Sequence, residues 1–196
     1  MLSHEHKYIF LHVPKCGGSS VVAALSRHPH SKKFKTGHPV LASYFDEFGD
    51  NVRDYFIFSI VRNPFARAVS AFKYLQKGGS KSSSDIRDRD QFDMKGLDFN
   101  KFVLKYFDQK TPLHFRSQAA FIGEYFKHVD YIGKLENIQL DFDNICDKIG
   151  ISRKKLPHVN KTNHLHYTEY YDDETRELVT ERYARDIELF GYEFGE

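Results

Sequence analysis

The feature that most constrains this fold is a short apolar segment, residues 8–13, that leads directly into a glycine-containing turn. The turn reads Pro14-Lys15-Cys16-Gly17-Gly18-Ser19-Ser20, and a helical pattern follows it. Glycines let backbone N–H groups approach an anion closely, and a helix N-terminus adds unpaired donors and a positive dipole end. A strand, a turn and a helix in this order predict a phosphate-binding loop, to which Lys15 adds a charge.

The position of the lysine separates this loop from the nucleotide triphosphate loop. In the pattern G-x-x-x-x-G-K-[ST], lysine follows the last glycine and the next hydroxyl binds Mg²⁺. Here Lys15 precedes both Gly17 and Gly18. The sequence therefore does not match the template for Mg²⁺-dependent nucleotide binding.

A second junction of strand and helix predicts a second anion site. Residues 55–61 form a continuous apolar run, typical of a buried parallel strand, and Arg62-Asn63-Pro64 follows it. A Mg²⁺-dependent phosphoryl transferase often has an aspartate at such a strand end, whereas an arginine binds an anionic group directly. Arg62 therefore favours a second phosphate over a metal.

The helix predicted after Pro64 adds further candidates. Its spacing places Arg67, Ser70 and Tyr74 on one face, from which we expect Ser70 to reach the same anion as Arg62. Two alternatives stay open: Ser70 is a small residue at a packing contact, and Arg67 pairs with a nearby carboxylate rather than supporting the anion site.

Residues 12–20 and 61–72 resemble the 5′-phosphosulfate loop and the 3′-phosphate motif of sulfotransferases, in particular the carbohydrate 2-O-sulfotransferase-like branch. The resemblance continues through residues 36–38, 131–137 and 156–162 and a C-terminal segment, and so spans nearly the whole chain. It implies a single sulfotransferase domain, residues 1–196. The expected fold is α/β, with a P-loop-like parallel β-sheet flanked by helices, which agrees with the order of strands and helices in the sequence.

The activity that the resemblance implies is transfer of a sulfuryl group from 3′-phosphoadenosine 5′-phosphosulfate (PAPS) to an acceptor hydroxyl. In-line displacement needs a base for the acceptor proton and donors where charge builds on the leaving phosphate. The family's histidine base matches His38, whose imidazole has a reference pKa of about 6.5. The predicted catalytic residues are His38 and Lys15. The predicted cofactor contacts are Pro14, Lys15, Cys16, Gly17, Gly18, Ser19, Ser20, Arg62, Ser70, Asn160 and Lys161.

Other interpretations of these motifs stay open. Gly37-His38-Pro39 also suits a simple turn, and Ser19 and Ser20 also suit helix caps. The polar residues 77–90 suit either a plain, mobile linker or a lid over the acceptor site. Histidine pairs spaced H-x-H occur at residues 4–6, 28–30 and 164–166, but they lack the cysteine or carboxylate spacing of a zinc site, so no metal is expected.

Composition restricts the remaining possibilities. The chain has 196 residues, of which 40% are hydrophobic, so one domain with a sizeable core is expected. A net charge of +2 gives no broad field for nucleic acid. Two cysteines far apart suit a reducing compartment. The absence of an apolar leader or membrane span predicts a cytoplasmic protein, or the catalytic domain of a Golgi-anchored one.

Two rival functions remain. One is a P-loop nucleotide kinase or hydrolase, which would need Mg²⁺ and ATP. The other is a non-catalytic nucleotide-binding module. For a sulfotransferase, the predicted partner is an acceptor glycan or a small hydroxylated molecule. Further elements predicted from the pattern are helices near residues 98–107, 116–125 and 136–149, a strand at 128–135, and a last helix that begins at 172–174.

Overall fold

The computed structural model describes residues 1–27, 31–32, 37–157 and 165–196. The chain divides into two compact units, each built from two stretches of sequence. Unit 1 comprises Met1–Arg62 and Gln118–Thr162, and unit 2 comprises Asn63–Ser117 and Asn163–Glu196. Unit 1 contains the sheet, whereas the regular elements described in unit 2 are helices. The single domain of residues 1–196 stays a prediction.

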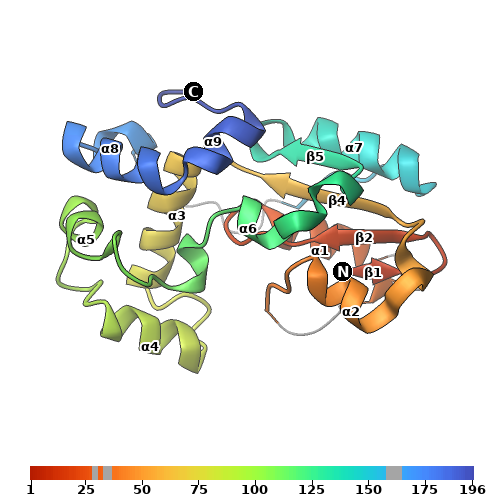
Figure 1. Ribbon diagram of the computed structural model, residues 1–196, viewed down its shortest axis with the longest axis horizontal. Helices are drawn as coiled ribbons and strands as arrows, with labels where there is room; N and C mark the ends of the chain where they lie inside the picture. The colour runs from red at the N-terminus through yellow and green to blue at the C-terminus, as the bar shows by residue number, and fades with distance from the viewer. Residues whose placement is uncertain (28–30, 33–36, 158–164) are drawn as a thin grey trace. The chain divides into compact units, whose positions relative to one another are not determined.

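The sheet of unit 1 has five strands in the order β3-β1-β2-β4-β5. Figure 1 labels β1, β2, β4 and β5 of this sheet. The strands are β1 Leu2–Ser3, β2 Tyr8–Leu11, β3 Ser31–Lys32, β4 Phe56–Val61 and β5 Tyr131–Lys134. The three central strands β2, β4 and β5 are parallel, whereas β1 runs antiparallel to β2 and to β3. The predicted α/β fold with a parallel sheet is therefore confirmed, with a short antiparallel extension at one edge.

The apolar runs form the central strands because both faces of the sheet are covered. Each residue of β2 is buried, as are the last five of β4. Continuous apolar sequence of this kind is typical of parallel strands. The buried Ser59 hydroxyl on β4 donates to the carbonyl oxygen of Leu11 at 2.8 Å, so the one polar side chain of this strand is satisfied internally.

Helices of unit 1 follow the strands in the predicted order. They are α1 Gly18–Leu25, α2 Ala42–Phe48, α6 Ala119–Ile122 and α7 Ile138–Ile149, with 3₁₀ turns η1 Gly49–Val52, η3 Gly123–His128 and η4 Leu135–Asn137. Helix α7 packs against β4 and β5, and it ends at Gly150, whose φ of 69° is the left-handed conformation common after a helix. The helix predicted at 116–125 is shorter, because Gly123 adopts a φ of 68° after α6.

Unit 2 is built around an aromatic core. Its helices are α3 Pro64–Gln76, α4 Ser83–Gln91, α5 Phe99–Tyr106, α8 Asp173–Arg182 and α9 Ala184–Phe190, with 3₁₀ turns η2 Leu113–Phe115 and η5 Tyr167–Tyr170. Phe72, Phe102 and Phe115 are buried at its centre, and the ring of Phe102 lies 5.3 Å from that of Phe72 and 5.0 Å from that of Phe115. Such ring pairs add to the free energy gained from burial alone.

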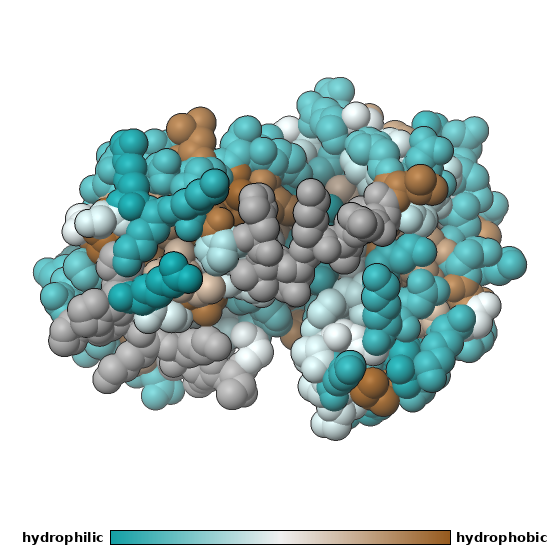
Figure 2. Space-filling model, turned by 180° about the vertical axis from the view of Figure 1, so that it is seen from behind, coloured by the Kyte–Doolittle hydropathy of each residue, from teal (hydrophilic) through white to brown (hydrophobic). Residues whose placement is uncertain are grey.

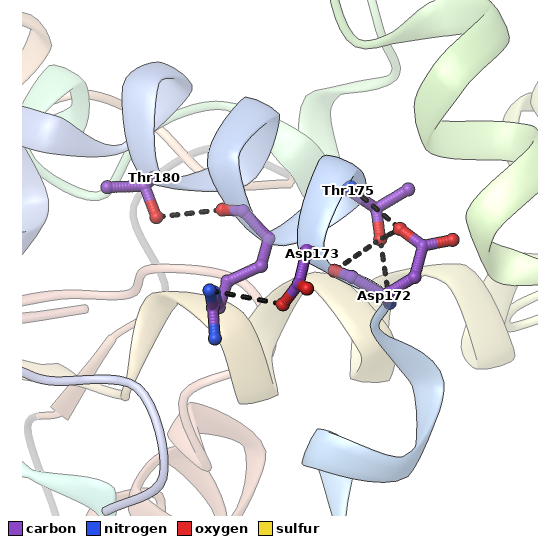
Figure 3. A network of polar contacts seen from close by, with 5 residues as sticks. Asp172, Asp173, Thr175 and Thr180 are labelled. Carbon is purple, nitrogen blue, oxygen red and sulfur yellow. Dashed lines mark hydrogen bonds and ion pairs between the residues drawn. The ribbon is translucent and has the colours of Figure 1, made fainter.

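Amide and acidic side chains cap helices α3 and α8 of unit 2. Asn63 accepts hydrogen bonds from the backbone N–H groups of Phe65 and Ala66 at the start of α3. Asp172 accepts from the N–H of Thr175 at 2.8 Å, and the Thr175 hydroxyl oxygen accepts from the N–H of Asp172 (Figure 3). This reciprocal capping starts α8 where the acidic run predicted a helix. The predicted last helix is divided into α8 and α9 at Tyr183.

The interpretation of residues 77–90 as a plain, mobile linker is wrong, because α4 begins inside this segment. Ser82 caps the helix, and the buried Asp85 accepts hydrogen bonds from the Tyr74 hydroxyl and from both the N–H and the hydroxyl of Ser80. Burial by itself raises the pKa of Asp85, but hydrogen bonds from Ser80 and Tyr74 outweigh it and hold the pKa below its usual value. A buried carboxylate therefore orders a segment whose composition looks like a linker.

Figure 2 shows one face of the molecule, on which hydrophilic residues predominate and hydrophobic residues form scattered patches. Scattered apolar residues of this kind are normal on a protein surface. Within the described ranges, no helix has both the length and the apolar character needed to cross a bilayer.

Candidate active site

The loop between β2 and α1 has an unusual backbone. Lys15 has a φ of 69° and Gly17 a φ of 74°, so both lie in the left-handed region. Lysine avoids this region, and a residue held there at a cost is often found at functional sites. Gly17 is the N-cap of α1 and supplies no capping side chain, so the start of this helix is built from backbone. The predicted phosphate loop thus has the left-handed turns that let successive N–H groups face an anion.

Side chains pack closely around the two glycines. A Cβ atom on Gly17 would lie 2.6 Å from Cδ1 of Leu135 and 2.8 Å from Cδ1 of Ile138. A Cβ atom on Gly18 would lie 2.0 Å from Cδ2 of the His12 ring. A side chain at either position would therefore displace its neighbours, and at Gly17 it would also meet the left-handed backbone.

We expect Gly17→Ala to destabilise unit 1 through two effects. A left-handed non-glycine residue costs about 1–2 kcal/mol, and added volume at a packed site typically costs about 1–3 kcal/mol more, reduced where flexible side-chain ends such as those of Leu135 and Ile138 move. Gly150→Ala is the matched control, because Gly150 has a φ of 69° and open space around its Cβ position. Urea denaturation should show a loss of unfolding free energy about 1 kcal/mol larger for Gly17→Ala than for the control. Equal losses would show that the loop has room for a side chain.

Arg62 lies beside this loop. It directly follows β4, the parallel neighbour of β2, so Arg62 and the loop share the carboxyl edge of the sheet, where ligands bind in folds of this kind. Nη1 of Arg62 donates to the carbonyl oxygen of Lys15 at 3.4 Å. The structure therefore brings together the two basic residues that the sequence assigned to separate anion motifs.

Gln118, which no sequence motif singled out, connects the same two segments. Gln118 is fully buried, and its Oε1 accepts from the backbone N–H of Arg62 at 2.9 Å, while its Nε2 donates to the carbonyl oxygen of Arg62 at 2.8 Å. The thiol of Cys16 donates to the same Oε1 at 3.1 Å. Because the Cys16 thiol is bonded to Gln118, a contact between Cys16 and a ligand would be made by the backbone of Cys16.

His38 is held at the start of the same loop. Its Nδ1 lies 2.9 Å from the carbonyl oxygen of His12, and the two imidazole rings meet edge to face with centroids 4.5 Å apart. A carbonyl oxygen only accepts hydrogen bonds, so Nδ1 of His38 carries the proton, and in the neutral ring Nε2 is the unprotonated nitrogen. His12 was not predicted. Its side chain contacts Phe10, His38 and the position above Gly18.

The remaining predicted residues have different surroundings. Pro14 is buried and has no N–H, Ser19 is exposed, and the N–H of Ser20 donates to the Gly17 carbonyl oxygen at 3.0 Å. Ser70 is buried on α3, in unit 2. Asn160 and Lys161 lie outside the described residues, as do Thr36 and two of the histidine pairs in whole or in part. The assignment of Ser70, Asn160 and Lys161 to the cofactor stays a prediction.

Arg67 and Tyr74 make internal contacts in unit 2. The Arg67 guanidinium is buried, donates to the carbonyl oxygens of His114 and Arg116, and lies 5.4 Å from the centre of the Tyr183 ring. These two acceptors are backbone carbonyl oxygens, and pairing of Arg67 with a carboxylate or support of the anion site stays a prediction. Within the part of the chain that the structure describes, no group of three or more His, Cys, Asp or Glu side chains comes together as a metal site.

Comparison with known proteins identifies the family. The model of the sulfotransferase family named Sulfotransfer_2 matches residues 1–193. The chain belongs to the sulfotransferase family. One curated relative is carbohydrate sulfotransferase 10 of Gallus gallus. It is 28% identical to this chain over 236 aligned residues, which cover 96% of the chain. The chain spans 64% of the length of that relative.

A solved structure has the same fold. The crystal structure of a sulfotransferase from Alicyclobacillus acidocaldarius aligns with this chain at a TM-score of 0.52, with 96% of each chain covered and 18% sequence identity. At this level of identity the similarity concerns the fold alone. The resemblance to sulfotransferases noted in the sequence motifs is confirmed by the family match.

Proposed function

We propose that the protein transfers a sulfuryl group from PAPS to a hydroxyl group of a carbohydrate acceptor, with His38 as the base. Family membership supports the reaction class, and the name of the relative, carbohydrate sulfotransferase 10, supports a sugar acceptor. The observation that carries the proposal is the contact between the Arg62 guanidinium and the Lys15 backbone carbonyl, because it brings the two predicted anion motifs together at one edge of the sheet. A small hydroxylated molecule is the other acceptor class.

The residues present fit a nucleotide that carries phosphate groups at both ends of its ribose. The glycine-containing loop and Lys15 suit the 5′-phosphosulfate, because backbone N–H groups at a helix N-terminus and an ammonium group stabilise a phosphate that gains charge as its bond breaks. Arg62 suits the 3′-phosphate, because a guanidinium binds a phosphate through paired hydrogen bonds. When bound, PAPS would supply the sulfuryl group and the leaving nucleotide.

The hydrogen bond of His38 suits the role of base. With Nδ1–H donated to the His12 carbonyl oxygen, Nε2 of the neutral ring accepts a proton without rotation of the imidazole. The edge-to-face contact with His12 further restricts the ring. A ring restricted in this way would keep its orientation while an acceptor hydroxyl binds, which supports the assignment of His38 as the base.

The location in the cell is also a proposal. Cys16 and Cys146 are both free and buried, which suits a reducing compartment such as the cytoplasm. The alternative is the catalytic domain of a Golgi-anchored protein, and fractionation of cells that express the natural gene would decide between them.

Calorimetry and a transfer assay together test the proposed function. We expect 3′-phosphoadenosine 5′-phosphate to bind without Mg²⁺, and labelled PAPS to sulfate at least one member of a panel of glycans and phenols. Tight binding of ATP that requires Mg²⁺, with no binding of the bisphosphate, would instead establish the kinase or hydrolase alternative. Binding of PAPS with no turnover of any acceptor would support the non-catalytic module.

A further inference from the structure

We propose that Gln118 is a positioning residue that holds Arg62 at a fixed position relative to the phosphate loop and so sets the preference for a 3′-phosphorylated donor. The inference rests on the proposed function, since Arg62 is the proposed 3′-phosphate contact. Gln118 lies outside both anion motifs, 56 residues from Arg62 and 102 residues from Cys16 along the chain.

The first argument is that the Gln118 side chain makes the backbone hydrogen bonds that a neighbouring strand would make just beyond the end of β4. The last paired residues of β4 and β5 are Val61 and Lys134. One residue later, both backbone groups of Arg62 bond to the carboxamide of Gln118, at 2.9 Å and 2.8 Å. The orientation of the amide is dictated by its partners, because an N–H requires the oxygen and a carbonyl requires the nitrogen. Gln118 therefore fixes the backbone of Arg62 where the sheet no longer does.

The second argument is that the same carboxamide also contacts the loop. Its Oε1 accepts from the Cys16 thiol at 3.1 Å, while the neighbouring Lys15 carbonyl accepts from the Arg62 guanidinium at 3.4 Å. These contacts join the phosphate loop, Gln118 and Arg62 in one connected set. A displaced Gln118 would therefore alter the spacing between the two proposed phosphate contacts.

The third argument is burial. Gln118 is fully buried, so water cannot replace its hydrogen bonds. An apolar side chain at position 118 would leave the N–H and the carbonyl oxygen of Arg62 without these hydrogen bonds. Because unpaired buried polar groups are costly, the backbone of Arg62 would shift until both groups find other partners. The expected consequence is weaker binding of the 3′-phosphate. Loss of the contact with Cys16 would affect binding of the 5′-phosphate alike in nucleotides with and without a 3′-phosphate.

The test compares the dissociation constants of adenosine 5′-monophosphate and 3′-phosphoadenosine 5′-phosphate by calorimetry. Their ratio measures the contribution of the 3′-phosphate and does not depend on the fraction of folded protein. We expect Gln118→Met, which keeps the side-chain length, to lower this ratio about tenfold, the scale of effect seen when the support of a ligand-binding residue is removed. In an Arg62→Ala background the same substitution should change the ratio less than about twofold, because Gln118 acts through Arg62.

Gln76→Leu is the matched control. The Gln76 amide donates to the carbonyl oxygens of Met94 and Leu97 in unit 2. The Gln76→Leu variant therefore loses side-chain hydrogen bonds to backbone carbonyls, as a Gln118 variant does, but away from Arg62. The ratio of the two dissociation constants should stay unchanged. If Gln118→Met fails to fold, Gln118→Leu replaces it with the same expectation. An unchanged ratio in a folded Gln118 variant overturns the inference. A ratio near one in the unmodified protein overturns the assignment of the 3′-phosphate and with it the proposed donor.

Discussion

Replacement of His38 by alanine is expected to lower kcat by about 10²- to 10⁴-fold, the range that a general base contributes. The physical reason is the bond from Nδ1 to the His12 carbonyl oxygen, which leaves Nε2 as the proton acceptor. The dissociation constant of 3′-phosphoadenosine 5′-phosphate should change less than about twofold, since the imidazole is assigned to the acceptor side. Steady-state kinetics with labelled PAPS and calorimetry measure the two quantities separately.

Two variants make this experiment decisive. His38→Asn keeps a donor for the His12 carbonyl oxygen but has no basic nitrogen, so it should lose activity while it preserves the local structure. His128→Ala is the control, because His128 is an exposed histidine of unit 1 that contacts Phe45 and Tyr125. Wild-type turnover by His38→Asn would exclude His38 as the base.

Replacement of Lys15 by alanine is expected to lower kcat/KM for PAPS by about 10²- to 10³-fold, as is typical when one group that stabilises developing charge is removed. Lys15 lies at the start of the loop, with a carbonyl oxygen that accepts from Arg62. Lys15→Arg keeps the positive charge but carries it on a planar guanidinium group, so it should retain part of the activity that Lys15→Ala loses. The measurement is the initial rate at PAPS concentrations below KM.

Lys7→Ala is the matched control for this prediction. Lys7 also has a left-handed backbone, with a φ of 43°, and it lies just before β2, whereas Lys15 follows that strand. It therefore matches Lys15 in residue type and backbone conformation but lies at the opposite end of the strand. Equal activities of Lys15→Ala and Lys7→Ala would show that the charge at position 15 has no part in the reaction.

The elements next to the predicted site could be located from sequence because local signals agree there. The apolar runs before Pro14 and Arg62 form β2 and β4, and the helices after them begin at Gly18 and Pro64. Parallel pairing then places both motifs at one edge of the sheet, so the proximity of Lys15 and Arg62 follows from topology.

The parts that could not be predicted depend on contacts between distant segments. Gln118 has an ordinary sequence context, and its role arises from bonds to residues far along the chain. Helix α4 was missed because its composition is polar, and its order comes from the buried Asp85. Arg67 has helical spacing toward the anion face, yet its acceptors are the carbonyl oxygens of residues 114 and 116, which no local pattern specifies.

The left-handed backbone of Lys15 affects how this protein could be engineered for heat resistance. Glycine at such a position relieves about 1–2 kcal/mol of conformational strain, so a library selected for thermal tolerance alone would favour Lys15→Gly and discard the ammonium group. The same relief is available at Lys7 and Lys81, whose φ values are 43° and 63°. A designer who wants a more heat-stable enzyme should therefore mutate Lys7 and Lys81 and leave Lys15 unchanged.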